Sequence, residues 1–181
     1  PYTIGSLLHA KMLCCDWDDF QGLHQEVQNH LKLKKPVILP FGFQAICDDE
    51  AELQTCATLA AQDMYPASKS GFIHPSWPPH TKIRVGYLCG EFREQATSIL
   101  MTEIWERHDK TQFEIYAFDN GFSDQSPRRA RIEQAFDHVI DISRMQDLDV
   151  AELIHHHQID ILINLNGFFG RERNKVFALR P

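Results

Sequence analysis

The hydrophobic period of this chain changes at a proline-rich stretch, and that change limits the possible folds more than any other feature. The stretch PASKSGFIHPSWPPHTK, residues 66–82, carries four prolines. Proline removes a backbone donor and biases the preceding residue towards extended conformations. Apolar residues recur at helical spacing before it, and short strand-like runs alternate with helices after it. We therefore expect a helical segment at 1–65, a linker at 66–82 and an α/β domain at 83–181.

Two helices are expected in the first segment. Asp16 is a candidate N-cap for a helix whose apolar residues recur every three or four positions from Trp17 to Leu31, and Pro36 stops it. A second helix is expected from about Asp49 to Tyr65, before the first proline of the linker. The pair resembles the end of a helical repeat array, although two helices are too few to establish a repeat.

After the linker, β-branched and aromatic runs are separated by segments long enough for crossover helices. Strands are expected at about 83–88, 113–118, 138–141 and 159–165. Helices are expected at about 95–107, 127–136 and 147–157. This alternation predicts an α/β fold with a Rossmann-like parallel sheet covered on both faces.

Ligands of such sheets bind beyond the carboxyl ends of the strands, so the loops there are the candidate site. These loops are 89–95, 119–126, 142–146 and 166–173. The first loop, CGEFREQ, does not match the G-x-G-x-x-G fingerprint of dinucleotide sites. Glu91 and Gln95 lie near the start of the next helix, where backbone N–H donors favour an anionic ligand or a carboxylate cap. The alternative is that Glu91 is only a cap and Gln95 only a surface residue.

The second and fourth loops carry further polar residues. Ser126 followed by Pro127 is typical of a helix start. The basic residues that follow it, Arg128, Arg129 and Arg131, are expected on a solvated helix face, with a phosphate site as the alternative. In the fourth loop, Asn166-Gly167 is either a simple turn or a site that presents an amide to a sugar hydroxyl.

Composition and charge narrow the classes of partner. The formal net charge is −7 and no basic stripe is present, which disfavours nucleic acid as a partner. No apolar run is long enough to cross a membrane, and the N-terminal residues do not resemble a signal peptide. Neither nucleic acid nor a membrane is therefore expected as a partner.

The five cysteines include no C-x-x-C pair, which favours reduced thiols in a cytoplasmic protein over a disulfide framework or a zinc site. The run from His155 to His157 does not predict a metal site either. Consecutive helical residues point about 100° apart, so one helix cannot direct all of them at one ion.

Several segments, in order, resemble the SPINDLY-like, protein O-linked N-acetylglucosamine transferase family. They are IRVGYLCGEF, TQFEIYAFDNG with RRARIEQAFDHVIDIS, and IDILINLNGFFGRERNKVFALRP. The resemblance covers about residues 82–181, and the preceding CCDWDDFQGLHQEV and KPVILPFGF look like the region that joins the repeats to the catalytic half in bacterial relatives.

The resemblance implies the GT-B architecture, in which tetratricopeptide repeats precede two Rossmann-like lobes. The first lobe holds part of the acceptor side, and the second binds most of the UDP-sugar. The reaction implied is inverting transfer of a sugar, expected to be N-acetylglucosamine, to a Ser or Thr of an acceptor protein or peptide. It needs no metal and no cofactor, since the UDP-sugar is a substrate.

The chain departs from the family pattern in the first loop, which in relatives reads roughly Ser-x-Asp-Phe-x-x-His. Glu91 stands in place of the Asp, and Gln95 in place of a His that is a candidate acid–base or positioning group. Glutamine cannot exchange a proton near neutral pH. Phe169 stands where relatives often have Thr. We expect Glu91, Gln95, Asn166 and Gly167 to bind substrate, and no residue is assigned a catalytic role.

Three interpretations remain open. The first is the N-terminal lobe of a protein O-glycosyltransferase; because the chain starts at Pro1 and stops at Pro181, it is expected to be a fragment that lacks the second lobe and is inactive alone. The second is a non-catalytic protein-interaction module with a degenerate transferase lobe. The third is an unrelated nucleotide-binding α/β domain.

Overall fold

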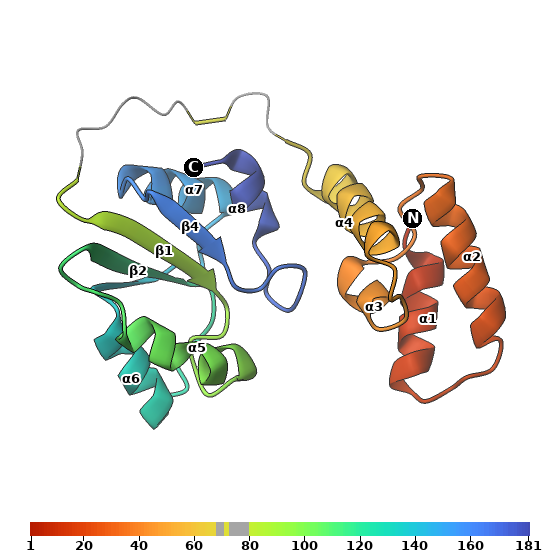
Figure 1. Cartoon of the computed structure of the whole chain (residues 1–181), viewed down its shortest axis with the longest axis horizontal. Coiled ribbons are helices and arrows are strands. Elements are labelled where there is room, and N and C mark those ends of the chain that lie inside the picture. Colours follow the sequence, from red (N-terminus) through yellow and green to blue (C-terminus); the bar gives the residue numbers. More distant parts are fainter. Residues whose placement is uncertain (68–70, 73–79) are drawn as a thin grey trace. The chain divides into compact units, whose positions relative to one another are not determined.

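The computed structural model describes residues 1–67, 71–72 and 80–181, and the chain divides into two compact units, Pro1–Ala67 and Ser68–Pro181 (Figure 1). The two units are described separately below. The proline-rich linker expected at 66–82 falls on their boundary, and its residues 68–70 and 73–79 lie outside the described residues.

The first unit is helical. Its helices are α1 (Thr3–Leu13), α2 (Phe20–Lys32), α3 (Pro40–Gln44) and α4 (Glu50–Met64). Their apolar faces meet in one core that includes Leu8, Val27, Phe43 and Cys56. The helix expected from about Asp49 is confirmed as α4, because the Asp49 carboxylate accepts hydrogen bonds from the N–H groups of Ala51 and Glu52 at 2.8 and 3.0 Å.

The expected N-cap of the preceding helix is wrong. The Asp16 carboxylate instead accepts from the Asp18 N–H at 3.0 Å and pairs with Lys11 at 2.6 Å, so the chain forms a turn before α2. Helices α1 and α3 were not predicted. Tertiary contact supports α1, since the Gly5 N–H donates to the Val37 carbonyl at 3.2 Å and a Cβ at Gly5 would lie only 2.5 Å from that oxygen.

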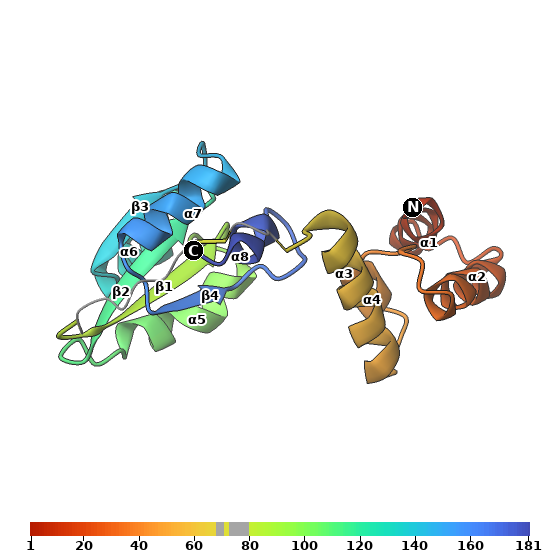
Figure 2. The ribbon, with the colours of Figure 1, turned by 90° about the horizontal axis from the view of Figure 1, so that it is seen from above.

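The second unit contains the predicted parallel sheet. Its strands are β1 (Ile83–Cys89), β2 (Phe113–Asp119), β3 (His138–Asp141) and β4 (Ile161–Asn164). The sheet order is β3-β2-β1-β4, and every neighbouring pair is parallel. β3 and β4 therefore lie at opposite edges of the sheet (Figure 2). This topology confirms the expected α/β fold class.

Helices cover both faces of this sheet. Figure 1 shows α5 (Ala96–Glu106) and α6 (Pro127–Ala135) on one face, and α7 (Asp147–His156) with α8 (Asn174–Leu179) on the other. The short helix α8 was not predicted, because it lies in a stretch interpreted as part of the last loop and its continuation. Among the described residues, no helix is long and apolar enough to cross a membrane.

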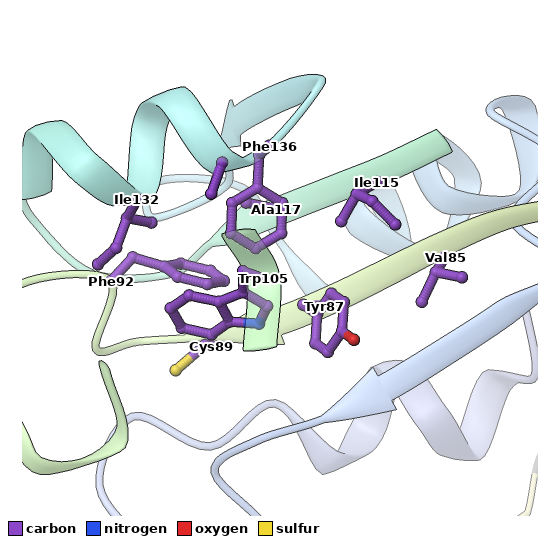
Figure 3. Packing of buried hydrophobic residues seen from close by; sticks show 10 residues of the cluster. Val85, Tyr87, Cys89, Phe92, Trp105, Ile115, Ala117, Ile132 and Phe136 are labelled. Carbon is purple, nitrogen blue, oxygen red and sulfur yellow. The ribbon is translucent and has the colours of Figure 1, made fainter. Parts of the chain in front are cut away.

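An aromatic cluster joins the first loop to the core of this unit. The buried Trp105 ring lies 5.3 Å from the rings of Phe92 and Phe136, centroid to centroid (Figure 3). Phe92 belongs to the loop after β1, whereas Trp105 lies on α5 and Phe136 follows α6. The buried Phe92 side chain therefore anchors the middle of the first loop to the core of this unit.

Candidate functional site

The loops after β1, β2 and β4 meet at the carboxyl edge of the sheet and are hydrogen-bonded to one another. The Gly90 N–H donates to the Asn166 side-chain oxygen Oδ1 at 2.8 Å. The Asn120 N–H donates to the Cys89 carbonyl at 2.9 Å, and the Asn120 side-chain nitrogen donates to the Arg171 carbonyl at 2.9 Å. Loops distant in sequence thus form one polar surface where α/β sheets bind ligands.

Asn166 and Gly167 form a fixed turn at this surface. The Asn164 oxygen Oδ1 accepts from the N–H groups of Asn166 and Gly167, both at 3.0 Å. Gly167 has φ +56°, which favours glycine, and a Cβ there would meet no atom within 4 Å. Asn166 is only 7% exposed, yet its nitrogen Nδ2 donates to no partner among the described residues. That amide remains available to a ligand.

Glu91 is held against the first turn of α5. Its carboxylate oxygen Oε2 accepts from the Thr97 hydroxyl at 2.6 Å, and its backbone oxygen accepts from the Ser98 hydroxyl at 2.5 Å. The N-cap of α5 is Gln95, not Glu91. Glu91 therefore orients the start of the helix through side-chain hydroxyls.

Gln95 has an exposed side chain that makes no cap hydrogen bond to α5. Its backbone N–H donates to the Arg93 carbonyl at 2.7 Å, which fixes the main chain and leaves the side chain free among the described residues. The structure joins Asn166 to the beginning of this loop and places Gln95 at its end. Such an amide can position a ligand but cannot exchange protons near neutral pH.

Arg129 holds two loops of the site together, a role that the sequence analysis did not predict. It was expected on a solvated face with its neighbours, but it is only 8% exposed. Its guanidinium donates to the Phe92 carbonyl at 2.9 Å and to the Asp119 carboxylate at the end of β2, and it pairs with Glu133 at 2.6 Å. The i,i+4 pair with Glu133 and the acidic strand end were the available signals. Arg129 thereby holds the first loop to β2.

Arg173 joins the remaining loops in a similar way, and it too was missed. It donates to the Asn120 side-chain oxygen at 3.1 Å and to the Met145 carbonyl at 2.8 Å, and its Nε lies 2.7 Å from the Asp147 carboxylate. One side chain therefore connects the loops after β2, β3 and β4. Spacing in the sequence carries no information about these long-range contacts.

Neither the thiol of Cys89 nor the histidines at the end of α7 provide a nucleophile or a metal site at this edge. Cys89 is fully buried at the end of β1, and burial raises the pKa of its thiol to about 12, so a thiolate nucleophile is disfavoured. His155 and His156 end α7 and His157 caps it. Burial lowers the pKa of His157. Within the described part of the chain, no group of His, Cys, Asp or Glu could hold a metal ion.

Comparison with known proteins gives the same family as the motifs. The family model of glycosyl transferase family 41 matches residues 47–181. The probable UDP-N-acetylglucosamine–peptide N-acetylglucosaminyltransferase SEC of Arabidopsis thaliana is 29% identical over 190 residues, covering 97% of this chain and 19% of the relative. The UDP-N-acetylglucosamine–peptide N-acetylglucosaminyltransferase of Caenorhabditis elegans is 34% identical over 101 residues, covering 55% of this chain and 9% of the relative.

A solved structure shares the fold. A mutant of the Thermobaculum terrenum O-GlcNAc transferase superposes with a TM-score of 0.69 at 22% identity, covering 97% of this chain and 34% of that chain. The chain spans about a fifth of the length of the Arabidopsis relative. The family match covers α4 and the whole second unit with its loops. The chain therefore belongs to glycosyl transferase family 41.

Proposed function

We propose that the protein containing this chain transfers N-acetylglucosamine from a UDP donor to a Ser or Thr hydroxyl of a peptide or protein. The observation that carries the proposal is the family match over residues 47–181, which includes every loop of the candidate site. The named relatives from Arabidopsis and Caenorhabditis are both described as UDP-N-acetylglucosamine–peptide transferases. The proposal concerns the whole protein, since the chain spans only part of the length of these relatives.

The second unit, in this proposal, is the first lobe of the transferase and contributes binding and orientation. The free nitrogen Nδ2 of Asn166 donates to a substrate oxygen, and the open turn at Gly167 lets that substrate approach the backbone. The exposed amide of Gln95 positions a second polar group. Glu91, held by Thr97, orients the loop that carries them. The acceptor oxygen attacks the anomeric carbon, UDP leaves with the bonding electrons, and a group other than Gln95 takes the acceptor proton.

The test is a transfer assay with the protein encoded by the complete reading frame. We expect labelled N-acetylglucosamine to move from UDP-N-acetylglucosamine to a Ser- or Thr-containing peptide. A folded, complete protein that transfers nothing to a broad library of such peptides would reject the proposal. That result would favour the alternative function, a non-catalytic interaction module, for which the specific observation is Gln95 in place of a residue able to exchange protons.

We further propose that the protein works in the cytoplasm and that its helical unit continues a tetratricopeptide array that binds protein partners. The thiols support the first part, because all five cysteines are free and the adjacent Cys14 and Cys15 are exposed, which suits a reducing compartment. Packing of α1 with α2 and of α3 with α4 supports the second part. Peptide mass spectrometry of the protein isolated from cells under thiol-trapping conditions tests the compartment: these five cysteines should be recovered as free thiols, and a disulfide among them would contradict the proposal.

A further inference from the structure

An aromatic ring stands exposed beside the candidate site and is held in place there. Phe122, in the loop after β2, is 57% exposed. Single exposed apolar residues are ordinary and indicate nothing by themselves. This ring differs because the Arg93 guanidinium lies over it, 4.6 Å from its centroid, and also donates a hydrogen bond to the Gly90 carbonyl. Arg93 thereby links the ring to the site.

The loop that carries Phe122 is fixed on both sides of the ring. Before it, the Gly121 N–H donates to the Asp119 carboxylate at 2.8 Å, and a Cβ at Gly121 would lie only 2.5 Å from the Gly90 carbonyl oxygen. After it, the Asp124 carboxylate accepts from the Glu94 N–H at 2.9 Å. The ring is thus ordered without being buried, so binding to it costs little conformational entropy.

The ring lies one contact away from the residues proposed to bind substrate. Gly90 donates to Asn166 through its N–H, and its carbonyl receives the hydrogen bond from Arg93. Asn166 and Arg93 therefore contact the same residue, Gly90, through its N–H and its carbonyl. This position belongs to the edge of the site.

The charge around Phe122 distinguishes between the two substrates, the diphosphate of the donor and the acceptor polypeptide. The first two loops and the start of α6 carry the carboxylates of Glu91, Glu94 and Asp124 and the guanidinium groups of Arg93 and Arg128. That is an excess of one negative charge if the mutually paired Asp119 and Arg129 are set aside. Arg128 is already paired with Glu94 at 2.8 Å. The Glu94 N–H lowers the pKa of Asp124, which keeps that exposed carboxylate charged. A diphosphate is disfavoured here, whereas a neutral or basic polypeptide is not.

We propose that Phe122, supported by Arg93, is a contact surface for the acceptor polypeptide, where an apolar side chain next to the modified Ser or Thr packs on the exposed face of the ring. This inference rests on the proposed transferase function. It assigns Phe122 to acceptor recognition, with no part in donor binding or in the transfer step.

The experiment measures KM for donor and acceptor separately, using the complete protein. The acceptor is the best substrate of the wild-type protein in a synthetic Ser/Thr-centred peptide library with varied flanking residues. We expect Phe122→Ala to raise KM for that peptide about fivefold to tenfold, the usual effect of one aromatic contact, and to leave KM for UDP-N-acetylglucosamine unchanged. Phe122→Tyr keeps the ring face and should retain the wild-type KM for the peptide.

The matched control is Leu100→Ala, which removes another exposed apolar side chain, 76% exposed on α5, and should change neither KM. Circular dichroism checks that the variants fold, and a photoreactive benzoylphenylalanine at position 122 should cross-link to the peptide. An unchanged peptide KM in Phe122→Ala, with normal wild-type transfer, overturns this inference alone. A raised donor KM also overturns it. Absence of transfer by the wild-type protein overturns the proposed function and this inference together.

Discussion

Arg129 shows how a single side chain can fix the position of the candidate site. Its guanidinium binds Asp119 on β2 and the carbonyl of Phe92 in the first loop, and both of these residues are buried. Removing one partner of a buried ion pair leaves the other charge unpaired, which costs about 3–5 kcal/mol. We expect Arg129→Met to lower the free energy of unfolding by about that amount, measured by urea denaturation of the 181-residue chain.

The control for this substitution is Arg131→Met on the same helix. Arg131 pairs with Glu106 at 2.8 Å on the surface, where solvent screens the interaction, so its loss should change the free energy of unfolding far less. Equal effects of the two substitutions would show that Arg129 is not the buried support described above.

Glu91 and Gln95 are predicted to have unequal effects on transfer by the complete protein. Gln95→Ala should lower turnover about tenfold to a hundredfold, because it removes a positioning hydrogen bond of about 1.4–2.7 kcal/mol. Glu91→Gln should have little effect, since an amide oxygen still accepts from the Thr97 hydroxyl. Steady-state kinetics decide between these roles. Loss of several orders of magnitude in a folded Glu91→Gln protein would mean that Glu91 takes part in the chemistry.

Cys89 is predicted to be unreactive in the folded chain. Burial raises the pKa of its thiol to about 12, so the reactive thiolate is scarce at pH 8, and the side chain is 0% exposed. Cys14 and Cys15 are exposed. Iodoacetamide followed by peptide mass spectrometry should therefore label Cys14 and Cys15 long before Cys89. Equal labelling rates in the folded chain would contradict the burial of the β1 end.

At the scale of single elements, α6 offers a test of its N-cap. The Ser126 hydroxyl accepts from the Arg129 N–H at 3.1 Å, and Pro127 follows as the first helical residue. We expect Ser126→Ala to lower the free energy of unfolding by about 1 kcal/mol, a typical loss for a capping side chain. Ser123→Ala, at an exposed loop position, is the control for urea denaturation. An effect of Ser126→Ala no larger than that of the control would argue against the cap.

Elements with strong local signals could be predicted from the sequence, and elements held by distant contacts could not. Ser126 caps its helix as expected, and the helix expected from about Asp49 is present, because caps and helical periodicity are properties of neighbouring residues. The parallel sheet also followed from local hydrophobic period and connection length. The short helices α3 and α8 were missed because five and six residues carry little periodicity.

The candidate site was predicted less completely than the fold. The predicted topology indicates the loops at the carboxyl edge, and the strand-end pattern indicates Asn166, which accepts a hydrogen bond from the Gly90 N–H. The roles of Arg129 and Arg173 depend on which strands are neighbours in the sheet, and composition gave no indication that either guanidinium turns inward. Buried polar networks join segments that are far apart in the sequence, so local sequence patterns do not predict them.

At the scale of the whole molecule, the 181-residue chain alone is predicted to bind UDP weakly or not at all. It covers 34% of the matched transferase chain, so most of that chain has no counterpart in it. Calorimetric titration of the isolated chain with UDP should show no low-micromolar binding. Affinity in that range corresponds to about −8 kcal/mol and would require a nearly complete site within these residues.

The most direct test of the central claim, that the loops at the carboxyl edge belong to a transferase active site, is the turnover of an Asn166→Asp variant of the complete protein. Aspartate keeps an oxygen for the Gly90 N–H and removes the free Nδ2 donor, so the loop contact should survive while the proposed substrate contact is lost. We predict that the wild-type protein transfers N-acetylglucosamine to peptide and that the variant, equally folded, does so about tenfold to a hundredfold more slowly. A variant as active as an active wild-type protein would contradict the claim.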